Sequence, residues 1–171
     1  PLQRIGWRYA RGEAAARRGD ARAVEQEAAE IARLREALSQ GPMREFAQAF
    51  SEVFQKVLEG RAAMIRHDWP AAIAAYGRAA ELQGQGPEGG DPPLVWFPTR
   101  RSLAAALLAS GDPAGARDKI VELLKDWPSD PYSYFVLAEA HEALGDHAAA
   151  ARARADGRVE WIGGAMSLGL A

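Results

Sequence analysis

The chain has 171 residues, of which 48% are hydrophobic and 8% aromatic, and its formal net charge is −2. This length accommodates one domain with a sizeable core or a short solenoid of helix pairs, and the small net charge disfavours binding to nucleic acid or to an anionic membrane. The absence of cysteine excludes disulfides, thiolate metal sites and cysteine nucleophiles.

The first two predicted helices are separated by a glycine and an aspartate. Helix-forming residues fill positions 3–18, and Gly19 and Asp20 follow them. Glycine suits the left-handed C-cap of one helix, and aspartate is a preferred N-cap for the next. We therefore predict a hairpin of two helices over residues 3–38, with its turn at these two residues.

A long helix is predicted over residues 43–66, after a break at Gly41 and Pro42. Its large apolar residues recur at helical spacing, and they are Phe46, Phe50, Phe54, Val57 and Leu58. We expect this stripe to face other helices.

His67 and Asp68 take the place that glycine and aspartate occupy in the other units, and they lead into a helix over residues 69–82. Residues 83–96 are rich in glycine and proline, so we predict a long inserted connection there. Four more helices are predicted after it, over residues 99–110, 113–126, 131–144 and 147–160.

These elements predict an all-α protein, organised as an α-solenoid of about four antiparallel hairpins within a single domain, residues 1–171. The hairpins span residues 3–38, 43–82, 97–126 and 131–160. The last two align at an offset of 34 residues, for example Ala116 with Ala150. A helix-turn-helix unit of about this length cannot bury its apolar face without a stacked neighbour.

The small, aromatic and turn residues of these units resemble the consensus of the tetratricopeptide repeat (TPR) family, in the form found in bacterial TPR proteins. In the last unit the matching residues are Pro128, Tyr134, Leu137, Ala138, Gly145 and Ala150. Earlier units match at Leu103, Ala104, Gly111 and Ala116, at Gly60, Ala72, Tyr76 and Ala79, and at Gly12 and Gly19. The resemblance implies a right-handed superhelix that acts as a scaffold for protein–protein interaction.

In TPR proteins the first helices of successive hairpins line a concave groove that holds an extended peptide or a partner's helix. Transferred to this sequence, the resemblance predicts a partner-binding groove with these residues: Phe54, Val57, Arg61, Met64, Trp96, Arg101, Leu108, Tyr132, Phe135, Glu139 and Glu142. No asparagine occupies the positions of the carboxylate clamp found in some TPR domains, which argues against that clamp here.

Several groove residues allow two interpretations. Arg61 and Arg101 either grip a partner's carboxylate or are solvated or paired locally. Glu139 and Glu142 share a face that would select a basic or amide-rich ligand. Trp96 either fills the space left by an aromatic missing at Arg100 or anchors a partner.

The sequence offers no convincing catalytic, metal or cofactor site. His141 and Glu142 begin like a zinc-protease helix, but Gly145 stands where a second histidine ligand is required. The glycines of the insertion lack the lysine and hydroxyl residue of a phosphate-binding loop. We predict a protein that is not an enzyme and carries no cofactor or metal.

Both ends of the chain have unusual compositions. Residues 1–24 carry six arginines, spread over several helical faces, and we interpret them as a solvated surface. Residues 161–171 are uncharged and apolar, so this tail either covers the last hairpin or docks into a second copy to form a homodimer.

No segment is apolar enough over about 18 residues to insert into a membrane. A cytoplasmic location is favoured, although the chain starts at Pro1 without methionine and we expect further sequence upstream.

The predicted function is a non-catalytic module that binds a protein or peptide partner. The alternatives are a homo-oligomerisation module and an accessory domain of a larger protein.

Overall fold

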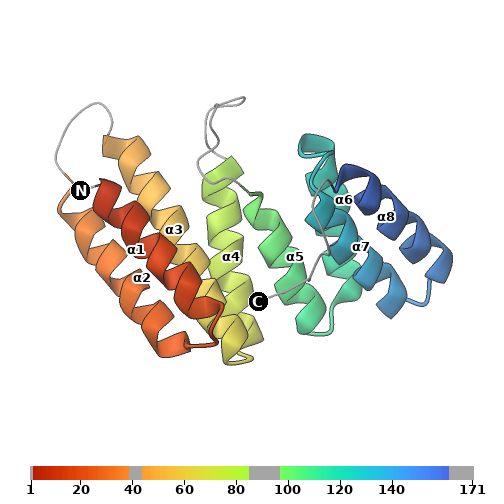
Figure 1. Ribbon diagram of the computed structural model, residues 1–171, viewed down its shortest axis with the longest axis horizontal. Helices are drawn as coiled ribbons and strands as arrows, with labels where there is room; N and C mark the ends of the chain where they lie inside the picture. The colour runs from red at the N-terminus through yellow and green to blue at the C-terminus, as the bar shows by residue number, and fades with distance from the viewer. Residues whose placement is uncertain (1, 39–43, 85–96, 162–171) are drawn as a thin grey trace. The chain divides into compact units, whose positions relative to one another are not determined.

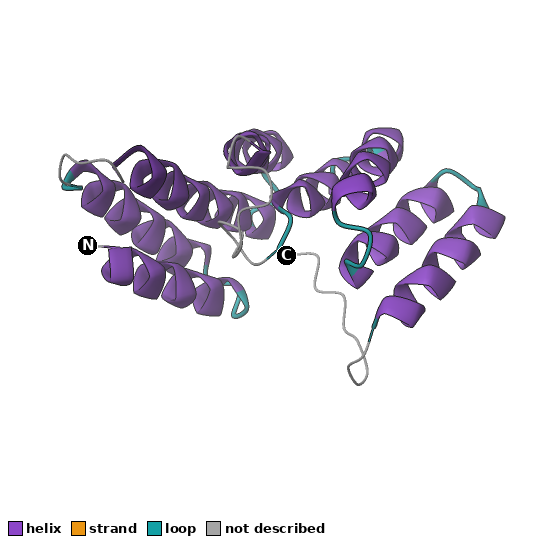
Figure 2. Ribbon diagram, turned by 90° about the horizontal axis from the view of Figure 1, so that it is seen from above, coloured by secondary structure: helices purple, strands orange, loops and turns teal. Residues whose placement is uncertain are grey.

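The computed structural model describes residues 2–38, 44–84 and 97–161, and the regular elements within these ranges are all helices (Figures 1 and 2). They are α1 (Leu2–Ala16), α2 (Ala21–Glu36), α3 (Arg44–Ile65), α4 (Trp69–Gly84), α5 (Thr99–Ala109), α6 (Pro113–Asp126), α7 (Pro131–Ala143) and α8 (His147–Glu160). The prediction of an all-α fold is confirmed.

The helix boundaries lie close to those predicted. Three ends differ by two residues: α1 and α2 each end two residues earlier than predicted, and α4 continues through Gly84, so the first two residues of the predicted insertion are helical. The predicted break at Gly41 and Pro42 and the rest of the insertion up to Trp96 lie outside the described residues.

The helices are grouped in two compact units, which are described separately. Unit 1 ends at Thr99 and contains α1 to α4, and unit 2 begins at Arg100 and contains the remainder of α5 with α6 to α8. Within each unit, helices that follow one another in the chain pack together, as in a helical solenoid. The assignment of residues 1–171 to one domain stays a prediction.

One turn structure recurs four times. Each copy has a residue with φ between 58° and 90°, followed by aspartate, and these left-handed residues are Gly19, His67, Gly111 and Gly145. At the third copy, the N–H of Asp112 donates to the carbonyl of Leu107 at 2.9 Å, which closes the helix end as a Schellman motif. The Asp112 carboxylate accepts a hydrogen bond from the N–H of Gly115 at 2.9 Å and caps the next helix.

The other three copies have the same bonds. His67 was predicted to replace glycine in the second copy, and its φ of 58° confirms this substitution. A left-handed conformation costs a residue with a Cβ atom about 1–2 kcal/mol, and histidine is one of the residue types that tolerate it best. The turn chemistry therefore defines the hairpins in both units.

Glycines allow the helices of unit 1 to approach closely. A Cβ atom on Gly60 of α3 would lie 2.5 Å from Cε1 of Tyr76 on α4, and one on Gly12 of α1 would overlap the side chain of Leu58 on α3. Tyr76 and Leu58 are themselves fully buried. These helix contacts therefore need glycine at both positions.

In unit 2, α5, α6 and α7 share an aliphatic cluster made of Ala104, Ala116, Ile120, Leu123, Val136 and Ala140. Ala116 and Ala150, the two alanines that align at the 34-residue offset, are both fully buried. This burial agrees with the expected role of small residues at close helix contacts. Gly157 has the same role between α8 and α7, because its Cβ atom would lie 3.0 Å from that of Tyr134.

Candidate partner-binding site

The predicted groove residues of α3 are mostly buried inside unit 1. The exposed fractions of Phe54, Val57 and Met64 are 7%, 0% and 8%. Phe54 stacks on Tyr9 of α1 with ring centroids 4.2 Å apart, and its ring centroid lies 4.4 Å from that of Phe50. Their assignment to partner binding stays a prediction, but the packing of α1 on α3 leaves them little surface for a partner.

Arg61 is paired within the same unit. Its Nε atom lies 3.5 Å from both carboxylate oxygens of Glu13 on α1, and Glu13 also accepts a hydrogen bond from the Tyr9 hydroxyl at 2.8 Å. Of the two interpretations of this arginine, the structure shows local pairing. The result is a polar cluster of α1 and α3 side chains next to the stacked rings.

Burial and the neighbouring polar groups together determine the pKa values in this cluster. Burial, reinforced by the negative charge of Glu13, raises the pKa of Tyr9, so its hydroxyl stays protonated and able to donate. Burial alone would lower the pKa of the Arg61 guanidinium, but its interactions with Tyr76, Glu13 and Tyr9 raise it. Arg61 therefore keeps its charge, and the cluster holds an ion pair rather than an acid or base ready to exchange a proton.

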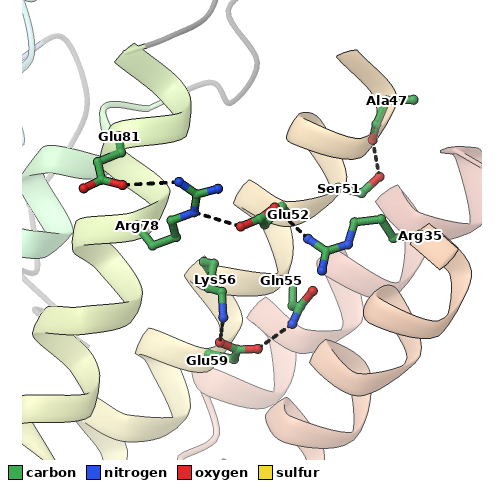
Figure 3. Close-up of polar contacts among 9 residues, drawn as sticks. All are labelled: Arg35, Ala47, Ser51, Glu52, Gln55, Lys56, Glu59, Arg78 and Glu81. Carbon is green, nitrogen blue, oxygen red and sulfur yellow. Dashed lines mark hydrogen bonds and ion pairs between the residues drawn. The ribbon is translucent and has the colours of Figure 1, made fainter. Parts of the chain in front are cut away.

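A second polar network joins α2, α3 and α4, and Figure 3 shows it. Glu52 of α3 pairs with Arg35 of α2 at 3.0 Å and with Arg78 of α4 at 2.9 Å. The hydrogen bond from Arg78 to Glu52 raises the pKa of that arginine. About two turns further along α3, Glu59 accepts from both Gln55 and Lys56 at 2.7 Å.

The Glu52 network was not predicted from the sequence. The spacing of three between Lys56 and Glu59 is visible in the sequence as a helical ion pair, but the contacts of Glu52 depend on how α2 and α4 pack on α3. The network holds three helices of unit 1 in register, and it belongs to the scaffold of the candidate site.

In unit 2, Arg101 is also paired locally. Its Nη1 atom lies 2.6 Å and 2.8 Å from the two carboxylate oxygens of Asp130, and its guanidinium lies 5.0 Å from the ring centroid of Tyr132. Asp130 also caps α7 by accepting from the N–H of Ser133. Tyr132 contacts Trp161 edge to face at 5.6 Å. Two predicted groove residues, Arg101 and Tyr132, are thus brought together at the start of α7.

Glu139 and Glu142 lie one turn apart on α7 and share a partner. Arg154 of α8 pairs with Glu139 at 3.2 Å and with Glu142 at 3.0 Å, and His147 also contacts Glu142 at 2.7 Å. Hydrogen bonds from Arg154 and His147 lower the pKa of Glu142. A basic ligand would therefore have to compete with Arg154 for both carboxylates.

The other groove residues differ in accessibility. Leu108 on α5 and Phe135 on α7 are half-buried, so part of each side chain is accessible. Trp96 lies outside the described residues, whereas its neighbour Phe97 is buried. The side chain of Gln83 donates to the carbonyl of Phe97 at 3.0 Å and accepts from the N–H of Thr99 at 2.8 Å.

Within residues 2–38, 44–84 and 97–161, no group of three or more histidine, aspartate or glutamate side chains is placed to bind a metal ion. None of the helices described is both long and apolar enough to cross a membrane. No protein-family model matches the chain, and a search of curated proteins finds no match.

Proposed function

We propose that the chain is a non-catalytic TPR-type module that binds a peptide or a partner helix through the first helices of its hairpins. The main support for this proposal is that the same turn, with its left-handed residue and aspartate cap, occurs four times. Arrays of repeated helix hairpins are the basis of extended protein-binding surfaces.

The small residues of the helix contacts give independent support. Gly12 and Gly60 on the first helices of the hairpins of unit 1, and Ala116 and Ala150 on the second helices in unit 2, stand where the TPR consensus has small residues. Each is placed at a contact that a larger side chain would disrupt.

In unit 2, the residues best suited to contact a partner are Leu108, Tyr132 and Phe135. All three are half-buried and belong to the first helices, α5 and α7. A partially accessible aromatic side chain contributes a large apolar area with little loss of conformational entropy on binding. Tyr132 is further held by Arg101 and Trp161, so it is ordered before a partner arrives.

The test is affinity capture from the source organism with the native chain and with the double variant Tyr132→Ala, Phe135→Ala. We expect proteins retained by the native chain to be lost by the double variant. The control is Val121→Ala, which removes an exposed apolar side chain from α6, a second helix. Circular dichroism and thermal melting establish that the variants are folded, and equal capture by all three folded chains would refute the proposed surface.

A self-assembly module is the second candidate, because the last turn of α8 carries an exposed valine and an apolar tail follows in the sequence. Val159 is 80% exposed, and the apolar tail that follows Trp161 lies outside the described residues. Light scattering separates the two functions. A concentration-independent monomer favours partner binding, whereas a dimer that removal of residues 162–171 dissociates favours self-assembly.

A further inference from the structure

The outward face of α1 carries a tryptophan surrounded by arginines. Trp7 is 55% exposed, and the guanidiniums of Arg8 and Arg11 lie 5.1 Å and 4.6 Å from its ring centroid. Sequence analysis interpreted the arginines of this region as a solvated surface. The structure instead brings two of them together on one exposed aromatic ring.

A buried carboxylate fixes this arrangement. Glu27 of α2, whose side chain is only 8% exposed, pairs with Arg8 at 3.1 Å and with Arg11 at 2.9 Å. Arg8 also contacts Glu30 at 3.6 Å. Both guanidiniums are therefore held next to Trp7, while the side chain of Arg11 remains 51% exposed. Such a site is ordered in advance, which reduces the entropic cost of binding a partner.

Four of the exposed residues of α1 recur with a heptad spacing. Arg4, Trp7, Arg11 and Ala14 are all exposed, at steps of three and four residues. The only acidic residue of α1 is Glu13, and it turns toward Tyr9 and Arg61 instead. The outward face thus presents cations and one large aromatic side chain without a carboxylate of its own.

We propose that the face formed by Arg4, Trp7, Arg11 and Ala14 docks an acidic amphipathic helix of a partner protein. A step of seven residues spans about 10 Å along a helix, the distance at which a partner helix repeats side chains on one face. Tryptophan and arginine are the residue types most often found as binding anchors, and carboxylates on the partner complement the arginines.

This surface contains none of the predicted groove residues, so the inference goes beyond the proposed function and does not depend on it. The face belongs to unit 1, whereas Leu108, Tyr132 and Phe135 belong to unit 2. The variant Phe135→Ala should therefore bind the acidic helix as the native chain does, and this separates the two proposals experimentally.

The experiment uses two fluorescent helical peptides, each three heptads long. One has glutamate beside a leucine seam in every heptad, and the other has lysine at the same positions. By fluorescence anisotropy, we expect the full chain to bind the glutamate peptide saturably with a Kd below about 100 μM, more weakly as salt rises, and to bind the lysine peptide at least about tenfold more weakly.

The variants identify the surface. Trp7→Ala and Arg4→Glu should each weaken binding of the glutamate peptide at least about tenfold. Arg22→Glu, at an exposed position on α2, is the matched charge control and should change binding less than about threefold. Trp7→Phe should recover part of the affinity, because a phenylalanine ring retains much of the apolar contact. Circular dichroism checks that each variant remains helical.

Three results would overturn the inference. They are equal binding of the lysine peptide, unchanged binding by both Trp7→Ala and Arg4→Glu, and no saturable binding of the glutamate peptide below about 1 mM. Binding to anionic phosphatidylglycerol vesicles without binding to the glutamate peptide would also contradict it, since the face would then recognise a membrane surface.

Discussion

Unit 1 and unit 2 have the same turns but different side chains between their helices. In unit 1, the contact of α1 and α3 contains the stacked rings of Tyr9 and Phe54, 4.2 Å apart, and the ion pair of Glu13 with Arg61. In unit 2, the shared cluster of α5 to α7 is aliphatic, and its centre includes Ile120. The turn therefore defines the hairpin, whereas the residues packed between the helices are free to differ.

The two units also differ in the lengths of their helices. The first helix of the second hairpin, α3, has 22 residues, whereas α7 has 13. The longer helix accommodates the Phe46, Phe50 and Phe54 ring contacts along one side. Regular spacing of 34 residues is therefore confined to unit 2, and unit 1 uses larger side chains over a longer contact.

The largest expected effect on the free energy of unfolding comes from truncating Ile120, at the aliphatic centre of unit 2. Ile120→Ala should destabilise the protein by about 2–5 kcal/mol, because it leaves a cavity among fully buried neighbours. Val121→Ala, next to it but 47% exposed, should change stability by less than about 0.5 kcal/mol. Urea unfolding measures both, and similar effects for the two variants would contradict the described core.

A smaller effect is expected from crowding the glycine contact of unit 1. Gly60→Ala places a methyl group against the buried ring of Tyr76 and should cost about 1–3 kcal/mol. Gly77→Ala on α4 is the control, since its Cβ atom would meet no other atom within 4 Å, and it should stabilise by about 0.5–1 kcal/mol. Thermal melting distinguishes the two, and stabilisation by both would show that Tyr76 can move aside.

Substitutions at the left-handed residue of the shared turn should change the free energy of unfolding by about 1 kcal/mol, with opposite signs in the two units. Gly111→Ala should destabilise unit 2 by about 1–2 kcal/mol, because alanine must adopt a φ of 90°. His67→Gly relieves the same conformation in unit 1 and should stabilise it by about 0.5 kcal/mol, after the entropy of glycine is subtracted. Chemical denaturation provides the values, and destabilisation by His67→Gly would reveal a packing role for the histidine beside Trp69.

The smallest effect concerns the exposed ion pairs between α7 and α8. Because hydrogen bonds from Arg154 and His147 lower the pKa of Glu142, its stabilising contribution is complete above its ordinary pKa near 4.5 and is lost as the pH falls through the lowered value. Arg154→Ala should return the pKa of Glu142 toward its ordinary value. Carbon-13 NMR titration of the carboxyl group measures this shift, and an unchanged titration would mean that the pair does not form in solution.

The sequence predicts the helices of this protein well because their signals are local. Gly111 and Asp112, and His67 and Asp68, place turns within a few residues of where they occur, and the apolar spacing of three and four marks the helices between them. These features depend on neighbours in the chain, which a single sequence displays.

The candidate site is predicted less completely because it depends on contacts between distant residues. Glu13 and Arg61 are 48 positions apart, and their pairing follows from the packing of α1 on α3. Val57 is fully buried, although the family resemblance predicts it on a partner-binding groove. The pairing of Glu27 with Arg8 and Arg11 likewise has no signal in the order of the residues.

The most direct test of partner binding is site-specific photo-crosslinking with a benzophenone amino acid placed at Phe135 or, as a control, at Val121. Both chains would be exposed to lysate of the source organism, irradiated, and their crosslinked products identified by mass spectrometry. We expect a distinct protein to be attached through position 135 and to be absent from position 121. The same products from both positions, or crosslinks only to a second copy of the chain, would contradict a partner-binding function for the first helices.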